Sequence, residues 1–354
     1  MAAQPDFDRR VLLRGGLAAS AAGAIGLSTA GTANAAQTGA RAAQPRIYST
    51  AQWGARSPSS PIVVLDHRPT YIVIHHTADA NSRDYSLAHA KKICRAIQRY
   101  HMDHNGWSDS GQQFTNTRGG YRLEGRHRSL SAVRDGGRHV QGANVGGYNS
   151  KVIGIENEGI YSKVNVPKAL WNSLVPLVAW IADQYGTRMK NIRGHRDFNS
   201  TECPGDVLYK RLKELREDVS RELGLAPPPE LLTWPLLRPG AIGPQVRAAQ
   251  HLLRAKGFSA VPVDGFFGTA TKQAVATLAD AHGIERHTCS ATHHSLVDET
   301  GYLGSDIWPL ITPTAQASGN GDVADAVSTL LSAGGDKAAS TGALAPSDWQ
   351  RLLA

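Results

Sequence analysis

An apolar run that ends in two histidines occupies residues 71–77, with the sequence YIVIHHT. The run is short and rich in aliphatic and aromatic residues, which predicts a buried β-strand. Successive side chains of a strand point to opposite faces, so His75 and His76 are not both directed at one metal ion. A histidine in such a strand is either a hydrogen-bonded core residue or a ligand, and the strand by itself leaves both interpretations open.

Two further residues of metal-ligand type lie close together later in the chain. Residues 193–197 read RGHRD and residues 201–205 read TECPG, which places His195 and Cys203 eight positions apart. Two imidazoles and one thiolate form a three-ligand set that suits Zn²⁺ and leaves a fourth tetrahedral position for water, as in catalytic zinc sites. Considered singly, Cys203 is also compatible with a small buried apolar residue or with half of a disulfide.

These motifs together resemble one family. The segments IHHTA (74–78) and GHRDFNSTECPG (194–205) resemble the zinc N-acetylmuramoyl-L-alanine amidases, which share a fold with the peptidoglycan recognition proteins and a phage lysozyme-amidase. Further similar segments are AQWGAR (51–56), YHMDHNGWSDSG (100–111), EGR (124–126) and GIE (154–156). The resemblance covers residues from about 47 to 222, the length of a whole domain.

The resemblance implies that His75, His195 and Cys203 bind one zinc ion, because the family pattern places the ligand at the first of the two adjacent histidines. His76 is then expected to be a packing residue or a residue that orients a ligand through its ring N–H. His101, in a predicted helix, is interpreted as a buried structural histidine and not as a ligand.

Residues 152–158, VIGIENE, alternate so that Gly154, Glu156 and Glu158 share one face of a predicted strand. A carboxylate in so apolar a strand generally has a partner or a function. In one branch of the family, the cytoplasmic anhydro-muropeptide amidases, a Glu at the position that matches Glu156 is the proposed general base. The resemblance implies this role for Glu156, whereas Glu158 fits a strand-end carboxylate that faces solvent.

One position departs from the family pattern. Many relatives carry a Tyr directly after the Gly of the Trp-Ser-Asp-x-Gly turn, and this chain has Gln112, which can hydrogen-bond but cannot titrate. We interpret the departure as shifting proton transfer onto Glu156. Thr201 occupies a place where relatives have Lys or Thr near the scissile carbonyl, and it is either a hydrogen-bond donor to the developing oxyanion or a capping residue. By loose alignment, the expected substrate-binding residues are Trp107, Arg126, His139 and Asn144.

The N-terminal residues 1–35 predict a twin-arginine signal peptide. Residues 8–14, DRRVLLR, contain the arginine pair, a Gly/Ala-rich stretch follows, and residues 33–35 supply an A-x-A cleavage site. The stretch is too rich in Gly, Ser and Thr for a bilayer-spanning helix, and no other run is apolar enough. We therefore expect a protein that is secreted to the cell wall by the twin-arginine pathway, with no membrane span after cleavage.

The charge of the chain suits an anionic cell wall. The full chain carries +8, and residues 1–35 contain three Arg and two Asp, which leaves +7 for the remainder. Nucleic acid is not an expected partner, because the chain has no aromatic-basic RNA motif, zinc finger or recognition-helix signature. The expected partner is peptidoglycan, both as muropeptide substrate and as cell-wall polymer, and we expect a monomer.

The pattern changes after a Pro-rich linker at residues 224–236. The segments GPQVRAAQHLL (243–253) and VDGFFGTAT (263–271) resemble the signatures of a three-helix peptidoglycan-binding domain, expected at 237–312. Residues 285–296 resemble an insertion with three histidines, which is either a polar loop or a second metal site. Residues 342–349, GALAPSDW, are similar to residues 301–308, GYLGSDIW, so the tail 313–354 is expected to be flexible or a degenerate half-repeat.

The expected fold is an α/β catalytic domain at residues 36–223, with a mixed central sheet flanked by helices, followed by a small all-α domain. Strands are predicted at 70–76, 113–118, 121–125, 152–157 and 191–194. Helices are predicted at 86–104, 168–186 and 205–223. If Cys203 binds zinc, the two remaining cysteines, Cys94 and Cys289, either form a disulfide or stay as buried thiols. The alternative function is a peptidoglycan recognition protein without turnover, and a weaker one is hydrolysis of a different amide.

Overall fold

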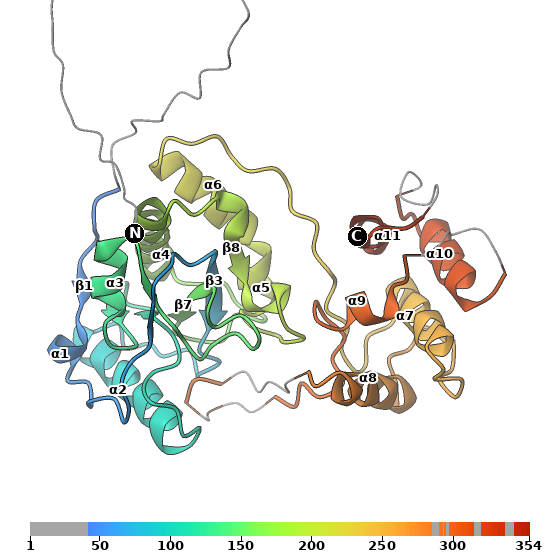
Figure 1. Cartoon of the computed structure of the whole chain (residues 1–354), viewed down its shortest axis with the longest axis horizontal. Helices are drawn as coiled ribbons and strands as arrows, with labels where there is room; N and C mark the ends of the chain where they lie inside the picture. Colours follow the sequence, from blue (N-terminus) through green and yellow to red (C-terminus); the bar gives the residue numbers. More distant parts are fainter. Residues whose placement is uncertain (1–41, 285–289, 293, 295–296, 315–319, 337–342) are drawn as a thin grey trace, which may run out of the picture. The chain divides into compact units, whose positions relative to one another are not determined.

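A six-stranded sheet forms the centre of the first part of the chain (Figure 1). The structure is a computed structural model that describes residues 42–284, 290–292, 294, 297–314, 320–336 and 343–354. The strands, in their order across the sheet, are β1 (Ile47–Tyr48), β5 (Arg122–Glu124), β4 (Phe114–Asn116), β7 (Val152–Asn157), β3 (Tyr71–His76) and β8 (Ile192–Gly194). All neighbouring pairs are parallel except β4 and β5, which confirms the predicted mixed sheet.

The two faces of the central strands carry different residues. Ile72 and Ile74 of β3 lie in one large hydrophobic core with helices α4 (Lys168–Tyr185) and α6 (Leu212–Glu222). Alternation along the strand places His75 on the opposite face. That face carries a small apolar cluster around Val73 and is otherwise rich in polar groups. The polar face of the sheet is therefore where the candidate site is built.

A second layer of helices packs at the edge of the sheet that carries β1 and β5. Helix α2 (Leu87–Asp103) begins after Ser86, whose hydroxyl accepts a hydrogen bond from the His89 N–H at 3.1 Å. Its buried Cys94 packs with Trp53 of α1 (Thr50–Trp53). The remaining elements of this part are β2 (Val64–Leu65), α3 (Ser129–Asp135), β6 (His139–Val140), η1 (Met189–Asn191), η2 (His195–Asp197) and α5 (Asp206–Lys210).

The C-terminal part has a hydrophobic core of its own, and both cores belong to one compact unit. Its helices are α7 (Pro244–Ala255), α8 (Thr269–Ala281), α9 (Trp308–Ile311), α10 (Asp322–Ser332) and α11 (Pro346–Leu353). We call residues 237–353 the helical region. The first three of these helices occupy the segment in which the three-helix domain was predicted.

The tail at residues 313–354, predicted to be flexible or a degenerate half-repeat, contains helices α10 and α11 among its described residues. Val327 and Leu330 of α10 and Trp349 of α11 are buried in the core of the helical region. The Trp349 indole N–H donates to the Pro313 carbonyl at 2.9 Å, as the Trp308 indole donates to the Pro235 carbonyl at 2.7 Å. The matching contacts favour the half-repeat over the flexible tail. The Gly, Ser and Ala residues between the helices concealed this apolar pattern.

Several predictions concern residues outside those that the structure describes. The signal peptide at residues 1–35 is one of them, and Cys289 is another, so its pairing with Cys94 stays open. Part of the predicted insertion at 285–296 also lies outside the described residues. Over the residues that are described, no helix has both the length and the apolar character that a bilayer span requires.

Candidate metal centre

The three predicted ligands meet at one edge of the sheet. Strands β3 and β8 are parallel neighbours with Ile74 opposite Gly194, so the residues that follow these two, His75 in β3 and His195 at the start of η2, emerge at the same edge. Cys203 lies in the loop after η2, and the Arg196 N–H donates to the Cys203 carbonyl at 3.1 Å, which closes that loop. One ligand atom from each of His75, His195 and Cys203 lies within 4.8 Å of the other two, and all three residues are buried.

The spacing of these atoms fits zinc. Tetrahedral Zn²⁺ with a nitrogen ligand at about 2.0 Å and a sulfur ligand at about 2.3 Å holds the two ligand atoms about 3.5 Å apart. The distance between His75 Nδ1 and Cys203 Sγ is 3.6 Å. Burial lowers the pKa of His75 to about 3, which keeps the imidazole neutral, as a metal ligand must be. The residues present can therefore hold a zinc ion.

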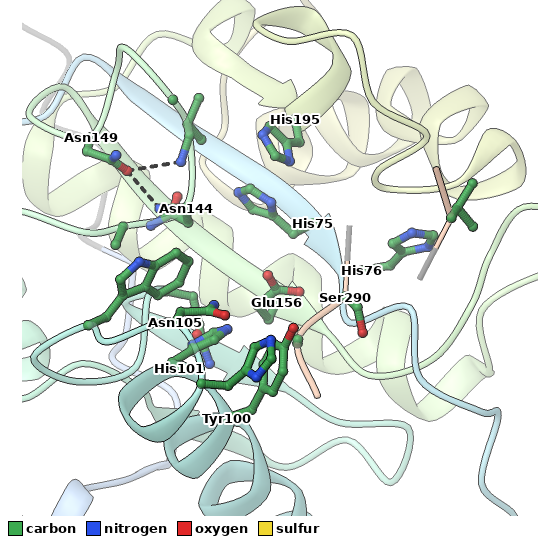
Figure 2. A pocket seen from close by; sticks show the side chains of 18 of the residues that line it. His75, His76, Tyr100, His101, Asn105, Asn144, Asn149, Glu156, His195 and Ser290 are labelled. Atoms are coloured by element: carbon green, nitrogen blue, oxygen red, sulfur yellow. Dashed lines mark hydrogen bonds between the residues drawn. The ribbon is translucent and has the colours of Figure 1, made fainter. Parts of the chain in front are cut away.

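His76 supports the ligands through its backbone. Its N–H lies 3.4 Å from Cys203 Sγ and donates to the sulfur. Its ring points away from His75 and His195 (Figure 2), and Nδ1 accepts a hydrogen bond from the Tyr161 N–H at 3.3 Å. The alternation of the strand thus gives one histidine to the ligand set and the other to the opposite face.

Glu156 lies beside the metal ligands. Strands β3 and β7 pair in parallel with His75 opposite Glu156, so the two side chains share a face. Glu156 is 9% exposed, and its Oε2 has no hydrogen-bond partner among the residues that the structure describes. Burial and the charge of Asp79 raise the pKa of Glu156 well above its usual value. A carboxyl group with these properties can exchange a proton at the site.

A pocket of about 740 Å³ lies over this face of the sheet, and His75, His195 and Glu156 line it. Figure 2 shows His75 and His195 next to each other, with Glu156 and Asn144 nearby. Trp107 and Asn144, two of the predicted substrate-binding residues, also line the pocket. The side-chain amide of Asn144 donates to the Gly111 carbonyl at 2.9 Å. The backbone N–H of Asn144 donates to Asn149 Oδ1 at 2.7 Å (Figure 2). Gln112 lines the pocket too and donates to Thr115 Oγ1 at 2.9 Å.

Two predicted substrate-binding residues do not line this pocket. Arg126 is 8% exposed, and its guanidinium donates to the Ser110 carbonyl at 2.9 Å and to Ser108 Oγ at 2.8 Å. His139 of β6 has no exposed surface, and its Nδ1 lies 2.8 Å from the His67 carbonyl oxygen. Both side chains hold loops together in the interior. Loose alignment placed them at the site because it follows chain position and not side-chain direction.

Two other predicted roles do not match the geometry. Glu158 does not face solvent: it is 1% exposed, and its carboxylate contacts His89 Nε2 at 2.7 Å and accepts from the Arg118 N–H at 2.9 Å. Thr201 is fully buried and does not line the pocket. Its hydroxyl donates to Glu299 Oε1 at 3.0 Å and accepts from the Cys203 N–H at 3.1 Å. Of the two roles considered for Thr201, this geometry matches capping.

Other pocket residues were not expected from the motifs. Tyr100, His101, His104 and Asn105 come from the C-terminal end of α2 and the turn after it. His101 Nδ1 accepts from the Gly111 N–H at 2.9 Å, which agrees with its predicted structural role. Ser290, Ala291, Val297 and Asp298 come from the segment before α9. The sequence carried no signal for this last group, because only the tertiary fold brings the segment to the sheet.

Known proteins share these segments. The family described as N-acetylmuramoyl-L-alanine amidase matches residues 65–206, and a peptidoglycan binding domain family matches residues 242–285. Peptidoglycan-recognition protein SC2 of Drosophila melanogaster is 33% identical over 171 residues, which are 47% of this chain and 84% of that protein. A human N-acetylmuramoyl-L-alanine amidase is 28% identical over 171 residues, which are 48% of this chain and 28% of that protein. The solved structure of Drosophila PGRP-LB has 26% identity and a TM-score of 0.41, and the match covers 52% of this chain and 99% of that one.

Proposed function

The chain belongs to the N-acetylmuramoyl-L-alanine amidase family, which includes peptidoglycan-recognition proteins, and we propose that it is a zinc-dependent amidase. The proposed reaction is hydrolysis of the amide bond between the lactyl group of N-acetylmuramic acid and L-alanine of the stem peptide in bacterial peptidoglycan. One observation carries this proposal: His75 and His195 line the same pocket as the buried carboxyl group of Glu156, and Cys203 Sγ lies 3.6 Å from His75 Nδ1.

The residues of the site suit the steps of this reaction. His75, His195 and Cys203 would hold the zinc ion, which would supply a Lewis acid for the lactyl carbonyl and would acidify the attacking water. Glu156 takes a proton from the attacking water and gives it to the nitrogen of the leaving L-alanine. Its raised pKa lets one carboxyl group accept and donate a proton in the same cycle.

The pocket supplies groups for a muropeptide. Trp107 offers an aromatic surface and Asn144 a side-chain amide, and both line the pocket beside the metal ligands. An aromatic ring suits the apolar face of a sugar, whereas an amide suits the polar groups of a peptide. We therefore assign substrate binding to Trp107 and Asn144 and do not assign it to Arg126 or His139.

The setting of the reaction follows from the same proposal. The helical region contains the segment that matches a peptidoglycan binding domain, and we assign it to attachment of the enzyme to the polymer. Attachment raises the local concentration of scissile bonds. We further propose that the protein is exported by the twin-arginine pathway, folds with its zinc before export, and acts in the cell wall as a monomer.

A second function is favoured by one residue. Gln112 lines the pocket where many relatives have a titratable tyrosine. A recognition protein that binds muropeptide without turnover needs no such group. The amidase remains the better-supported proposal, because the chain has all three predicted ligands close together and Glu156 in the pocket beside them.

Release of stem peptides from purified cell-wall sacculi decides between the two functions. The wild-type protein is compared with Glu156→Ala and Cys203→Ala, with zinc content measured for each. Glu214→Gln, on the exposed side of α6, serves as the matched control because Glu214 pairs with Arg211 and is not in the pocket. If the protein is an amidase, the wild type releases peptides with new L-alanine amino termini, whereas Glu156→Ala and Cys203→Ala release none. A wild-type protein that binds sacculi and releases nothing is a recognition protein.

A further inference from the structure

The helical region contacts the loop that holds two of the metal ligands. We call residues 195–206 the ligand loop, because His195 begins it and Cys203 lies within it. Arg238 reaches Glu202 at 3.0 Å and Asp206 at 2.6 Å. Ser305 Oγ donates to the Arg196 carbonyl at 2.6 Å, and the Gly304 N–H donates to Ser200 Oγ at 2.8 Å. The contacts are polar, specific in geometry and concentrated on one short segment.

Glu299 is the innermost of these contacts. It is 5% exposed, and its Oε1 accepts two hydrogen bonds from the ligand loop. One comes from the Thr201 hydroxyl at 3.0 Å and the other from the Glu202 N–H at 2.7 Å. Thr201 Oγ1 in turn accepts from the Cys203 N–H at 3.1 Å. A continuous chain of hydrogen bonds therefore runs from the helical region to the backbone of a metal ligand.

The same segment also reaches the strand that carries His75. The Ala291 N–H donates to the Thr77 carbonyl at 2.9 Å, and Thr292 Oγ1 hydrogen-bonds to Asp79 Oδ1. Thr77 directly follows the pair His75 and His76. Residues of the helical region thus touch both parts of the chain that supply the ligand set, the end of β3 and the ligand loop.

A carboxyl group buried at this place has a considerable cost. Removal of a carboxylate from water is unfavourable unless hydrogen bonds replace its hydration. Anchoring to a polymer requires no buried acid beside a metal site, and an apolar side chain in this place would avoid the desolvation cost of the carboxyl group. An apolar residue, however, would leave the Thr201 hydroxyl and the Glu202 N–H without their acceptor inside the protein. The observed arrangement fixes the ligand loop at two points.

We propose that Glu299 is a positioning residue of the metal centre, which holds the Cys203 sulfur in place through Thr201 and makes the helical region a structural part of the zinc site. The inference rests on the proposed function only in taking zinc as the metal. It assigns the helical region a role in addition to attachment to the polymer. Metal affinity and turnover of small soluble muropeptides then both depend on this region.

The test uses full-length protein that is stripped of metal and titrated with Zn²⁺ against a competing chelator. In Glu299→Leu, zinc affinity falls about 10- to 100-fold, the usual effect of removing a group that orients a metal ligand. Glu299→Gln keeps the acceptor oxygen and stays within about threefold of the wild type, on the same reasoning. Co²⁺ provides a second readout, because the thiolate-to-cobalt absorption reports directly on the bond to Cys203. In Glu299→Leu this absorption weakens or shifts, and in Glu299→Gln it does not.

Two further variants complete the design. Asp348→Asn removes a carboxylate from the helical region that pairs with Arg351 and does not touch the ligand loop, so zinc affinity stays at the wild-type value. Thr201→Val breaks the chain of hydrogen bonds from the other side and gives the loss seen in Glu299→Leu. If Glu299→Leu does not fold, Thr201→Val decides by the same readouts.

The outcomes separate this inference from the proposed function. Wild-type zinc affinity and wild-type cobalt absorption in folded Glu299→Leu or Thr201→Val overturn the positioning role, whatever the activity. A wild-type protein that binds zinc tightly and cleaves no muropeptide overturns the amidase and leaves the positioning role intact. When the protein is active, the positioning role also predicts a lower kcat for Glu299→Leu on a soluble muropeptide, with KM little changed.

Discussion

His75 and Glu156 stand directly opposite each other in the parallel pairing of β3 and β7. The register fixes both side chains on the polar face of the sheet, so the proposed metal ligand and the proposed base are held by backbone hydrogen bonds within the sheet. Strand β8 adds His195 at the same edge through the pairing of Ile74 with Gly194. Three parallel strands therefore fix where His75, Glu156 and the start of the loop at His195 lie, and Cys203 is placed by the loop that follows.

Glu156→Gln tests this arrangement. The amide has nearly the same shape and cannot exchange a proton, so kcat on a soluble muropeptide falls about 10²- to 10⁴-fold. Zinc content stays at the wild-type value because Glu156 is not a ligand. The thermal midpoint rises, since a buried carboxyl group with a raised pKa is replaced by a neutral group.

The matched control for this prediction is Glu158→Gln, two residues further along the chain. Glu158 is also buried but pairs with His89, so its replacement lowers stability and leaves the rate of the folded enzyme within a few-fold of wild type. Equal rate losses in the two variants would mean that Glu156 has no special part in the reaction.

Removal of one metal ligand has a different signature. Cys203→Ser is expected to lower zinc affinity by at least 100-fold, because the weakly acidic hydroxyl replaces a thiolate whose sulfur bonds zinc strongly. Chelator treatment of the wild type abolishes activity, and added Zn²⁺ restores it. Inductively coupled plasma analysis of the purified proteins checks the metal content.

Cys94→Ala is the control for the thiol itself. Burial raises the pKa of Cys94 to about 12, so this thiol stays protonated and takes no part in metal binding. Its replacement costs some core packing beside Trp53 and leaves one zinc ion per chain. A zinc content that falls in Cys94→Ala and stays at the wild-type value in Cys203→Ser would contradict the assigned ligand set.

The sequence predicted what depends on local pattern. The continuous apolar run at residues 71–77 and the alternation at residues 152–157 predicted the two strands, and the resemblance to the amidase family implied the three ligands. Arg126 and His139 were predicted to bind substrate but do not line the pocket, because pattern does not report whether a side chain turns into a pocket or into the interior. Glu299 was not identified, since it lies 96 positions beyond Cys203 in the numbering, and its role exists only through tertiary contact. Glu158 was placed in solvent because its partner His89 belongs to a distant helix.

Gly154→Ala tests how closely the pocket is packed. A Cβ atom at Gly154 would lie 2.4 Å from Asn144 Oδ1, so the Asn144 side chain must move. We expect a loss of about 1–3 kcal/mol in the free energy of unfolding and a higher KM for muropeptide. Asn144→Ala alone also raises KM for muropeptide, and it removes the oxygen atom with which a Cβ atom at position 154 would clash. Urea unfolding and steady-state kinetics of the single and double variants check the prediction.

The double variant gives the decisive comparison. With Asn144 already shortened, Gly154→Ala costs less stability than it does in the wild type, because the clashing atoms are absent. Additive effects of the two changes would show that Gly154 and Asn144 do not constrain each other.

Glu299 makes stability depend on pH in a defined direction. Burial raises its pKa from the ordinary 4.5 to about 7. Between these values the unfolded chain has lost the proton and the folded chain has kept it, so stability is full below pH 4.5 and declines as the pH rises toward 7. The shift corresponds to a decline of about 3 kcal/mol. Glu299→Gln does not titrate, so the free energy of unfolding of metal-free wild type falls relative to this variant between pH 5 and pH 8. Urea unfolding at both pH values measures the difference, and a difference that is constant or of opposite sign would mean that Glu299 is ionised in the folded protein throughout this range.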